Sequence, residues 1–208
     1  CTGSSPAMPP IPGIDSEHVV DSTGILNCET LPEHLIIVGG GVIGCEFACM
    51  YASVGVPVTV LEAMSEICPN LDADVAAVLR KELAKKGVNF KLDTKVESID
   101  PKSVSFANAD GTASLEGDLV LVATGRTPNV KGLGLEELGL DIDPRGGVRV
   151  DDRGATNVPG LWAAGDVTGQ AWLAHAASRM AEVVVHNLTG RPDRMRYDKM
   201  PAVVYTSP

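Results

Sequence analysis

A run of glycines directly behind a short apolar segment constrains the fold of this chain more than any other feature. Residues 34–44 read HLIIVGGGVIG, in which Gly39, Gly41 and Gly44 form the pattern G-x-G-x-x-G. A continuous apolar run that ends in glycine is typical of a parallel strand buried on both faces. The next segment, VIGCEFACMYASVG, predicts a helix that stops at Gly55. Strand, glycine turn and helix together predict the start of a Rossmann-like α/β sheet.

A second strand and an acidic residue complete the pattern. VPVTVLEA predicts another buried strand, and Glu62 near its end comes eighteen residues after Gly44. In dinucleotide-binding folds the glycines allow a tight turn, close approach of the backbone to a pyrophosphate, and packing of helix on strand. The helix N-terminus attracts phosphate, and the acidic side chain accepts hydrogen bonds from a ribose. We therefore favour a nucleotide site over a glycine turn without a ligand.

Strands and helices continue to alternate beyond this point. Asp72 is the expected N-cap of a helix over ADVAAVLRKELAKKG, whose apolar positions Val75, Val78, Leu79 and Leu83 have helical spacing. The short segments VNFKL, KVESID and SVSFAN predict strands of an antiparallel extension that replaces a helical crossover. GDLVLVATG predicts a further buried strand. Together these segments predict an open parallel sheet with an antiparallel extension.

The composition of the chain changes after Thr127, where glycine and proline become frequent. The segment PNVKGLGLEELGLDIDPRGG, rich in glycine and proline, is interpreted as a connection. GVRVDDRGATNVPGLWAAGDV predicts short strands that end at Gly165, and LAHAASRMAEVVVHNLTG predicts a helix that stops at Gly190. The first residue is not Met, and the closing segment MPAVVYTSP is interpreted as part of a strand, so we expect a piece of a longer protein.

Composition excludes several classes of function. The formal net charge is −10 and aromatic residues make up 4%, which argues against nucleic-acid binding and against anionic membranes. No apolar run approaches the roughly 20 residues that span a bilayer. An odd number of cysteines, five, is not a disulfide framework. We therefore expect a reducing, cytoplasmic environment.

Cys45 and Cys49 lie four residues apart on the first predicted helix. This spacing puts their Cβ atoms about 5–6 Å apart, whereas a disulfide needs about 3.5–4.5 Å. We therefore interpret both as small residues of the core and not as a redox couple. With no C-x-x-C pattern and no histidine at metal-ligand spacing to a cysteine, we expect no metal site.

Five segments, in order and across the whole chain, carry a resemblance to a known family. They are IIVGGGVIGCEFA, VTVLEA, LVLVATGRTPN, LWAAGDV and YTSP. The chain resembles the flavoprotein pyridine nucleotide–disulfide oxidoreductases, and within that family it is most similar to the dihydrolipoamide dehydrogenases. The resemblance implies two nucleotide-binding domains and a dimer-interface domain. It also implies electron transfer between dihydrolipoamide, an active-site disulfide, FAD and NAD.

The resemblance implies cofactor contacts at particular positions. It places the NAD pyrophosphate on Gly39, Gly40, Gly41, Val42, Ile43, Gly44, Cys45 and Glu46. Glu62 would bind the adenosine ribose and Val96 would pack beside the adenine, while Gly125 and Arg126 would line the NAD cleft. The residues implied for FAD are Thr2, Gly3, Ser4, Asp166, Trp172, Leu173, Ala174 and His175. Among these, Asp166 would bind the ribityl chain and the last four would bring a helix N-terminus to the flavin.

The FAD positions each have a structural alternative. Asp166 is also a plausible helix N-cap, His175 a surface histidine, and Thr2–Ser4 a terminus without fixed structure. For NAD, Glu62 favours a ribose 2′-hydroxyl over a 2′-phosphate. Glu66 adds negative charge, and the segment AMSEI offers no Arg or Lys.

The resemblance also implies what the chain does not carry. The family's first glycine fingerprint, its C-x-x-x-x-C redox pair and its catalytic His–Glu have no counterpart in the sequence, so we expect no catalytic residue here. The expected domains are 1–14 (part of an FAD domain), 15–127 (NAD-binding), 128–195 (the returning FAD domain) and 196–208 (the start of the interface domain).

The expected partners follow from the same resemblance. They are NAD(H), a lipoyl-bearing acyltransferase of a 2-oxo acid dehydrogenase complex, and a second copy of the longer parent protein. The chain alone is expected to be an inactive monomer. Two alternatives remain open: a mercuric-reductase-like or transhydrogenase-like flavoprotein, and a non-catalytic module that binds NADH.

Overall fold

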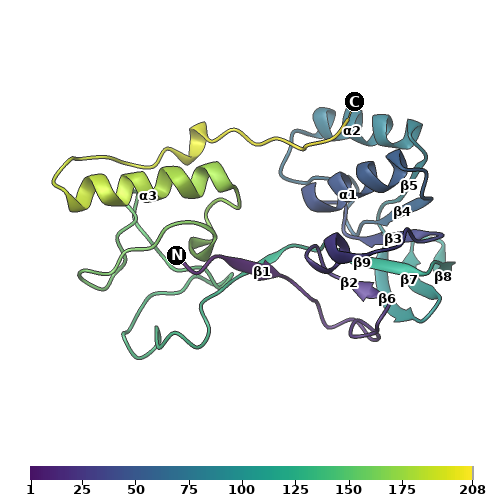
Figure 1. Cartoon of the computed structure of the whole chain (residues 1–208), viewed down its shortest axis with the longest axis horizontal. Coiled ribbons are helices and arrows are strands. Elements are labelled where there is room, and N and C mark those ends of the chain that lie inside the picture. Colours follow the sequence, from purple (N-terminus) through teal and green to yellow (C-terminus); the bar gives the residue numbers. More distant parts are fainter. Residues whose placement is uncertain (208) are drawn as a thin grey trace. The chain divides into compact units, whose positions relative to one another are not determined.

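The computed structural model describes residues 1–207, which fall into two compact units (Figure 1). The sheet unit comprises Pro6–Gly125 with residues 204–207, and the helix unit comprises Cys1–Ser5 with Arg126–Val203. The units therefore change at residues 5/6, 125/126 and 203/204. The predicted domains change instead after residues 14, 127 and 195, and their assignment to cofactors stays a prediction.

A five-stranded parallel sheet forms the middle of the sheet unit. Its strands are β2 (Val19–Val20), β3 (Leu35–Val38), β4 (Val58–Leu61), β5 (Val88–Lys91) and β9 (Leu119–Val122). Their order is β2-β9-β3-β4-β5, and every neighbouring pair is parallel. The predicted Rossmann-like α/β sheet is confirmed, with β3, the strand before the glycines, at its centre.

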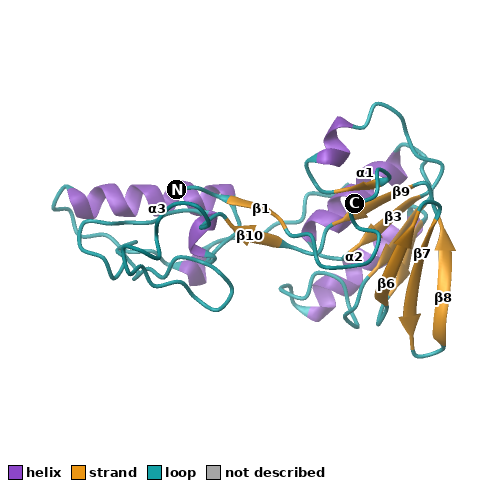
Figure 2. Ribbon diagram, turned by 90° about the horizontal axis from the view of Figure 1, so that it is seen from below, coloured by secondary structure: helices purple, strands orange, loops and turns teal. Residues whose placement is uncertain are grey.

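The parallel sheet is covered on both faces. Helices α1 (Val42–Ser53) and α2 (Ala73–Lys85) lie on one face. The other face carries a three-stranded antiparallel sheet, seen as a separate layer in Figure 2. Its strands are β6 (Lys95–Asp100), β7 (Ser103–Asn108) and β8 (Gly111–Glu116). Because this layer joins β5 to β9, it is the predicted antiparallel extension in place of a helical crossover.

Burial on two faces explains the unbroken apolar run of β3. Leu35 and Ile37 belong to the core beneath α1 and α2. Ile36 and Val38 belong to the core beneath β6 and β7. All four are buried, and each contributes about 1.5–3 kcal/mol through removal of its side chain from water. A polar residue at any of these positions would disrupt one of the two cores.

One prediction for the strands after α2 was wrong, and one strand was missed. The segment VNFKL does not join the antiparallel extension, because Val88 pairs with Val58 and makes β5 the edge of the parallel sheet. Strand β8 was not predicted. Its sequence GTASLE is largely exposed and therefore lacks an apolar signal.

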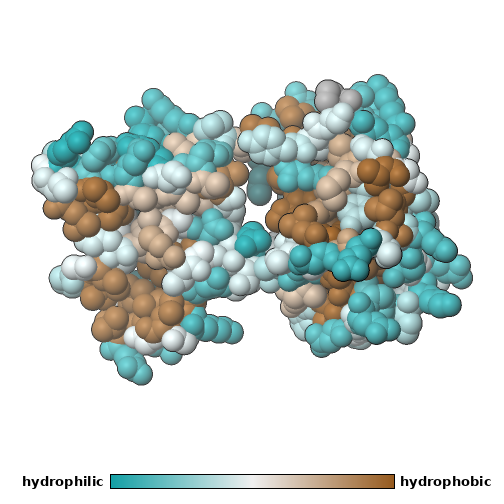
Figure 3. Space-filling model, in the orientation of Figure 1, coloured by the Kyte–Doolittle hydropathy of each residue, from teal (hydrophilic) through white to brown (hydrophobic). Residues whose placement is uncertain are grey.

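Helix α2 packs through a different face from the one its valines suggest. Val75 and Val78 are 52% and 61% exposed, whereas Ala76 and Leu83 are buried in the core. Asp72 does occupy the N-cap position, but its side chain makes no capping hydrogen bond. The predicted helix is therefore confirmed, and its predicted core face is wrong at the two valines. Their exposed side chains add apolar surface to α2. On the face drawn in Figure 3, apolar patches alternate with hydrophilic ones.

The helix unit contains little regular structure besides one helix. Strands β1 (Ser4–Pro6) and β10 (Arg126–Pro128) pair with each other, and α3 spans Ala174–Leu188. Short 3-10 helices are η2 (Asp166–Thr168) and η3 (Tyr197–Lys199), and η1 (Gly24–Asn27) lies in the sheet unit. Met180 and Val183 bury the inner face of α3 against Ala164 and Met195.

Two strand predictions in the last third of the chain were also wrong. The region 147–167 forms turns with single bridges, Ile142 to Val148 and Ala155 to Trp162, and no strand. Its backbone amides are satisfied locally instead; for example, the Asp151 carboxylate accepts hydrogen bonds from the N–H groups of residues 153 and 155. Residues 201–207 contain no strand either.

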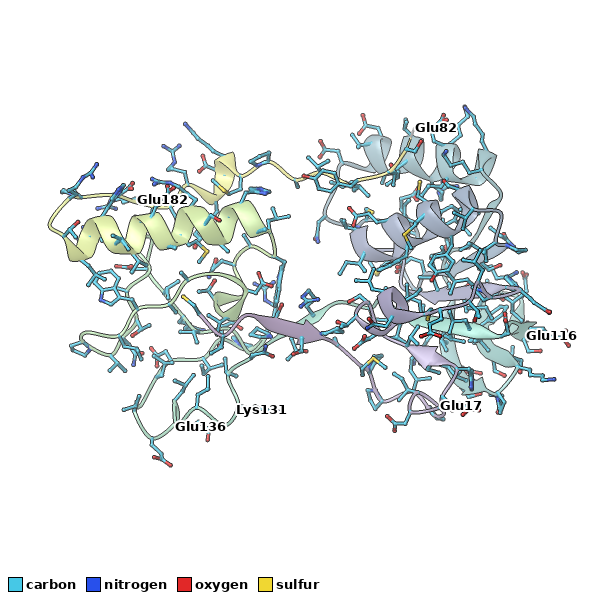
Figure 4. The ribbon with its side chains drawn as sticks, in the orientation of Figure 1. Glu17, Glu82, Glu116, Lys131, Glu136 and Glu182 are labelled. Atoms are coloured by element: carbon cyan, nitrogen blue, oxygen red, sulfur yellow. The ribbon has the colours of Figure 1, made fainter. Side chains whose placement is uncertain are left out.

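Charged side chains lie on the outside of both units. In Figure 4, Glu82 projects from α2 and Glu182 from α3. Each pairs with a basic residue on its own helix, Lys85 and Arg179 respectively. Exposed pairs of this kind contribute little to stability, so the buried cores and the glycine packing hold the fold.

We predict that Gly44→Ala is strongly destabilising. A Cβ on Gly44 would lie 2.0 Å from the Gly39 carbonyl oxygen, so α1 would have to move away from β3. Overpacking of this kind costs about 1–3 kcal/mol, or more when backbone is displaced. Gly41→Ala is the matched control, because a Cβ there meets no atom within 4 Å, and it should cost less than about 1 kcal/mol. Urea denaturation measures both, and equal losses would contradict this account of the packing.

Candidate functional site

The three glycines of the fingerprint serve three different needs. Gly39 has φ +107°, and a Cβ there would lie 2.6 Å from the Ala123 carbonyl oxygen. Gly44 allows α1 to touch the Gly39 carbonyl. Gly41 is the N-cap of α1, has φ −70°, and would place a Cβ in open space. Neither backbone conformation nor packing within the fold therefore requires glycine at position 41.

Glu62 follows β4 and fixes the glycine turn, which is the segment 39–41 between β3 and α1. Its Oε2 accepts a hydrogen bond of 2.6 Å from the Gly40 N–H, and its Oε1 accepts one of 2.7 Å from the Met64 N–H. The residue is 8% exposed. The carboxylate thus links the end of β4 to the turn after β3, a structural role that the sequence did not predict.

A cavity of about 720 Å³ opens beside Glu62 in the sheet unit. It is lined by Pro9, Pro10, Ile11, Pro12, Val38, Gly39, Leu61, Glu62, Ala63, Thr94, Lys95, Val96, Glu97 and Thr124. Three of the predicted site residues, Gly39, Glu62 and Val96, therefore meet at one cavity although they are far apart in the sequence.

Several lining residues were not predicted from the sequence. The segment Pro9–Pro12 forms part of the wall, and its sequence PPIP indicates only a stiff loop. Lys95 and Glu97 flank Val96 on β6, and they bring one charge of each sign to the cavity. The signal for both lay in their adjacency to Val96. The segment AMSEI after Glu62 offers no cation, as noted from the sequence, but Lys95 reaches the same cavity from β6.

Glu66 does not add free negative charge to the site. Its carboxylate forms two hydrogen bonds with the Arg80 guanidinium, of 2.8 and 3.0 Å. These bonds hold the pKa of Glu66 below its usual value. The expected electrostatic contribution of Glu66 is therefore corrected: Arg80 neutralises it, and Glu62 and Glu97 remain as the carboxylates of the cavity.

The other predicted pyrophosphate residues at the start of α1 offer mainly backbone groups to a ligand. No side chain caps the N-terminus of α1, so its first N–H groups have no side-chain acceptor. Val42 and Ile43 lie on this turn, and Glu46 follows with its Oε1 accepting a 2.8 Å hydrogen bond from the Tyr205 N–H. This arrangement presents backbone donors and a positive dipole end beside Gly41.

Four of the predicted FAD residues, Thr2–Ser4 and Asp166, form one hydrogen-bonded cluster in the helix unit. The Ser4 hydroxyl donates a 2.6 Å hydrogen bond to the Asp166 carboxylate. Asn129 fixes the neighbouring residues: its carbonyl accepts from the Thr2 hydroxyl at 2.6 Å, and its N–H donates to the Gly3 carbonyl at 3.0 Å. The segment Thr2–Ser4 is therefore held by hydrogen bonds, and the alternative of a terminus without fixed structure is wrong.

Asp166 and Arg126 belong to this same cluster. Asp166 is the first residue of η2, and Gly165, not Asp166, occupies the N-cap position, so the capping alternative is wrong. The Arg126 guanidinium donates to the Ser4 hydroxyl at 2.7 Å and to the Ser4 carbonyl at 2.9 Å. Arg126 is not among the residues that line the cavity beside Glu62. Its neighbour Gly125, with φ +132°, accepts a hydrogen bond from the Ala7 N–H.

The segment Trp172–His175 leads into α3, as predicted. Leu173 is the extended N-cap residue and Ala174 is the first residue of the helix. Trp172 is 40% exposed. The His175 ring contacts the Pro201 carbonyl through Nε2 at 2.9 Å. This exposed histidine therefore has a backbone partner.

Three of the five cysteines are core residues, whereas Cys1 and Cys28 are exposed. Cys45 and Cys49 are buried in the core between α1 and the parallel sheet, which confirms that interpretation. All five cysteines are free thiols. Among residues 1–207 there is no cluster of three metal-ligating side chains, and none of the helices is long and apolar enough to cross a membrane.

The chain matches the pyridine nucleotide-disulphide oxidoreductase family over residues 1–181 and belongs to it. Dihydrolipoyl dehydrogenase 3 of Pseudomonas putida is 43% identical over 215 residues, an alignment that covers 100% of this chain and 46% of the relative. The chain spans about half the length of the curated relatives that it matches. The family predicted from the five sequence segments is thereby confirmed.

Solved structures agree with this assignment. LpdA from Mycobacterium tuberculosis has a TM-score of 0.89 and 34% identity, covering 99% of this chain and 45% of that chain. The HOCl-induced flavoprotein disulfide reductase RclA from Escherichia coli has a TM-score of 0.85 and 38% identity, covering 98% and 47%. Both similarities extend over the sheet unit and the helix unit together.

We predict that Glu62→Ala destabilises the chain by about 1–3 kcal/mol. The substitution leaves the Gly40 and Met64 N–H groups without acceptors in a largely buried site. Glu97→Ala removes a carboxylate from the same cavity, but this residue is exposed, so its cost should stay within about 0.5 kcal/mol. Urea denaturation compares the two variants. A Glu62 variant as stable as the Glu97 variant would show that the carboxylate does not hold the turn.

Proposed function

We propose that the sheet unit binds NAD(H) as the nucleotide-binding part of an FAD-dependent, dihydrolipoamide dehydrogenase-like oxidoreductase. The observation that carries this proposal is Gly41. The fold needs glycine at positions 39 and 44 for its own packing, whereas at position 41 glycine leaves an open surface over the start of α1. A bound pyrophosphate is a physical reason for keeping that surface free of a side chain.

The first turn of α1 supplies the attraction for the pyrophosphate. Its N–H groups have no side-chain acceptor, and the helix dipole places partial positive charge at Gly41 and Val42. Backbone donors bind phosphate oxygens without adding a formal charge to an otherwise acidic chain. In this proposal Gly39–Glu46 holds the pyrophosphate, and Glu46 lies toward the nicotinamide end.

The cavity accommodates the adenosine half of the nucleotide. A carboxylate has about four acceptor sites, so Glu62 retains capacity for ribose hydroxyls while it holds Gly40 and Met64. Val96 and Ile11 supply apolar surface for the adenine at the same cavity. Its volume lies within the range of 300–1,000 Å³ that is common for ligand sites.

Two opposing charges decide between NADH and NADPH. Glu62 accepts hydrogen bonds from a 2′-hydroxyl and repels a 2′-phosphate. Lys95 lines the same cavity and would attract the phosphate. We propose that Glu62 prevails, because it is buried where the ribose lies, whereas Lys95 is exposed and its charge is screened by water.

The helix unit contributes part of an FAD site in this proposal. Thr2–Ser4 and Asp166 form one hydrogen-bonded cluster, and Asp166 would bind the ribityl chain. Arg126 supports that cluster through Ser4. Gly125 would reach the nucleotide cleft as the neighbour of Thr124, which lines the cavity. The N-terminus of α3, approached by Trp172–His175, would stabilise negative charge on the flavin. FAD, when bound, supplies a carrier that passes electrons between thiols and a pyridine nucleotide.

The partners of the complete protein are part of the same proposal. The 208 residues contain no C-x-x-x-x-C, so we place the redox disulfide outside them. We propose dihydrolipoamide on a lipoyl-bearing acyltransferase as the reductant, a homodimer as the complete enzyme, and the cytoplasm as its location. The five free thiols support a reducing compartment.

The test is the ratio of NADPH to NADH dissociation constants, measured by calorimetry on the chain. We expect the wild type to prefer NADH at least about tenfold, which corresponds to about 1.4 kcal/mol. Glu62→Gln should bring the ratio close to one, and Lys95→Met should raise it. Because both nucleotides use the same glycine turn, any loss of turn order in the Glu62 variant affects both constants and leaves the ratio interpretable.

The decisive result is that the ratio of dissociation constants moves in opposite directions in the two variants, falling in Glu62→Gln and rising in Lys95→Met. If the wild type binds neither nucleotide, the proposal as a whole is refuted. Equal affinities in the wild type, or a ratio that does not change in Glu62→Gln, would remove Glu62 from the ribose site. A ratio that falls in Lys95→Met would show that the lysine does not face the 2′-position.

A further inference from the structure

Two cysteines from different parts of the sequence meet beneath the glycine turn. The Sγ atoms of Cys45 and Cys68 lie 3.8 Å apart. Both thiols also face the Gly40 carbonyl oxygen, at 3.4 Å from Cys45 and 3.7 Å from Cys68. Both residues are buried, and both belong to the core beneath α1. The pair is distinct from Cys45 and Cys49, because Cys49 contacts the Ser207 carbonyl instead.

The backbone holds this pair in place from two elements. Cys45 lies in the first turns of α1, and Cys68 lies in the loop between β4 and α2. Cys68 has φ +46°, a left-handed conformation that a residue with a Cβ rarely adopts. A 2.9 Å hydrogen bond from the Cys68 N–H to the Gly40 carbonyl fixes this conformation. Such strained positions persist only where the surroundings determine them, and they occur most often at functional sites.

The two thiols are chemically unequal. In the neutral pair the Cys68 S–H donates to the Cys45 sulfur. When Cys68 ionises, its thiolate accepts from the Cys45 S–H instead, which lowers the pKa of Cys68. The same hydrogen bond, together with burial, raises the pKa of Cys45. Cys68 is therefore the better nucleophile of the pair, and Cys45 stands within reach as the second, resolving thiol.

We propose that Cys45 and Cys68 form a disulfide when the protein meets a small hydroperoxide, and that this bond weakens nucleotide binding at the glycine turn. The Cys68 thiolate attacks the terminal peroxide oxygen, the O–O bond breaks, and the departing hydroxide or alkoxide takes a proton and leaves as water or an alcohol. The Cys45 sulfur then attacks the resulting sulfenic acid, the S–O bond breaks, and water leaves. The two thiols lose two electrons, which the hydroperoxide gains.

The disulfide would act on the turn through Gly40. The two sulfur atoms must approach from 3.8 Å to about 2.05 Å, which draws the Cys68 loop toward α1. Both S–H groups are lost, so the Gly40 carbonyl loses two of its contacts. Gly40 lies between Gly39 and Gly41, and its N–H is the group that Glu62 holds. The effect on binding rests on the proposed NAD(H) site, whereas formation of the disulfide does not.

The experiment maps the disulfide directly. In a background where the exposed Cys1 and Cys28 are replaced by Ser, the chain is treated with hydrogen peroxide, alkylated, and digested without reduction. The first Lys or Arg of the sequence is Arg80, so trypsin leaves every cysteine in one peptide. Cleavage after Glu46, Glu62 and Glu66 instead places Cys45, Cys49 and Cys68 in three different peptides.

We expect a cross-linked peptide that joins Cys45 to Cys68 in this background and in its Cys49→Ser control. Cys68→Ser and Cys45→Ser should lack it, with circular dichroism reporting that each variant is folded. Free, alkylated Cys45 and Cys68 in the treated protein, or a link from either to Cys49, would overturn the proposal.

NADH affinity measured on the same samples decides the second half of the proposal. Oxidation should weaken binding at least about threefold, dithiothreitol should restore it, and Cys68→Ser should not respond. If the disulfide is mapped but the affinity for NADH does not change, the proposal that the disulfide controls the glycine turn is wrong. A reduced protein that binds no NADH would refute the proposed function, and the peptide map would still decide the disulfide.

Discussion

The glycine turn after β3 is organised by the two peptide groups of Gly40. Its N–H donates to the Glu62 carboxylate at 2.6 Å, and its carbonyl accepts from the Cys68 N–H at 2.9 Å. The turn is thereby tied both to the end of β4 and to the loop that precedes α2. Gly39 and Gly44 remove the remaining freedom, because each contacts backbone too closely for any side chain. A turn held in this way can bind a ligand without first becoming ordered, which reduces the entropic cost of binding.

Local sequence patterns predicted the elements around this turn and failed where long-range pairing decides. The run LIIV, the glycine spacing and VTVLEA were sufficient for β3, α1 and β4, because burial on both faces leaves a strong apolar signal. Val88 carried no sign of whether its strand would pair with Val58 or join the antiparallel layer. The region 147–167 alternates apolar and polar residues as a strand would, yet its amides are satisfied within turns.

The candidate site shows the same division. Gly39, Glu62 and Val96 were predicted and meet at one cavity. Lys95 was overlooked although it adjoins Val96, whereas Ile11 could not be predicted, because only folding brings it to the cavity. The contact between Ser4 and Asp166 spans 162 residues of sequence. Only the resemblance to a family suggested that Ser4 and Asp166 belong to one site. A periodic sequence pattern cannot reveal a contact over such a separation. The nearness of Cys45 to Cys68 depends on the unusual φ of Cys68, which no residue pattern signals.

In the proposed site, Gly41 is glycine because a bound pyrophosphate needs the open surface over the start of α1. The most direct test is calorimetric titration of NADH into the wild-type chain and into Gly41→Ala, with urea denaturation of both. A Cβ at this position meets no atom of the protein within 4 Å, so the variant should fold with wild-type stability to within about 1 kcal/mol. The account predicts that its NADH dissociation constant rises at least about tenfold, which corresponds to about 1.4 kcal/mol. A stable variant that binds NADH as tightly as the wild type would contradict it.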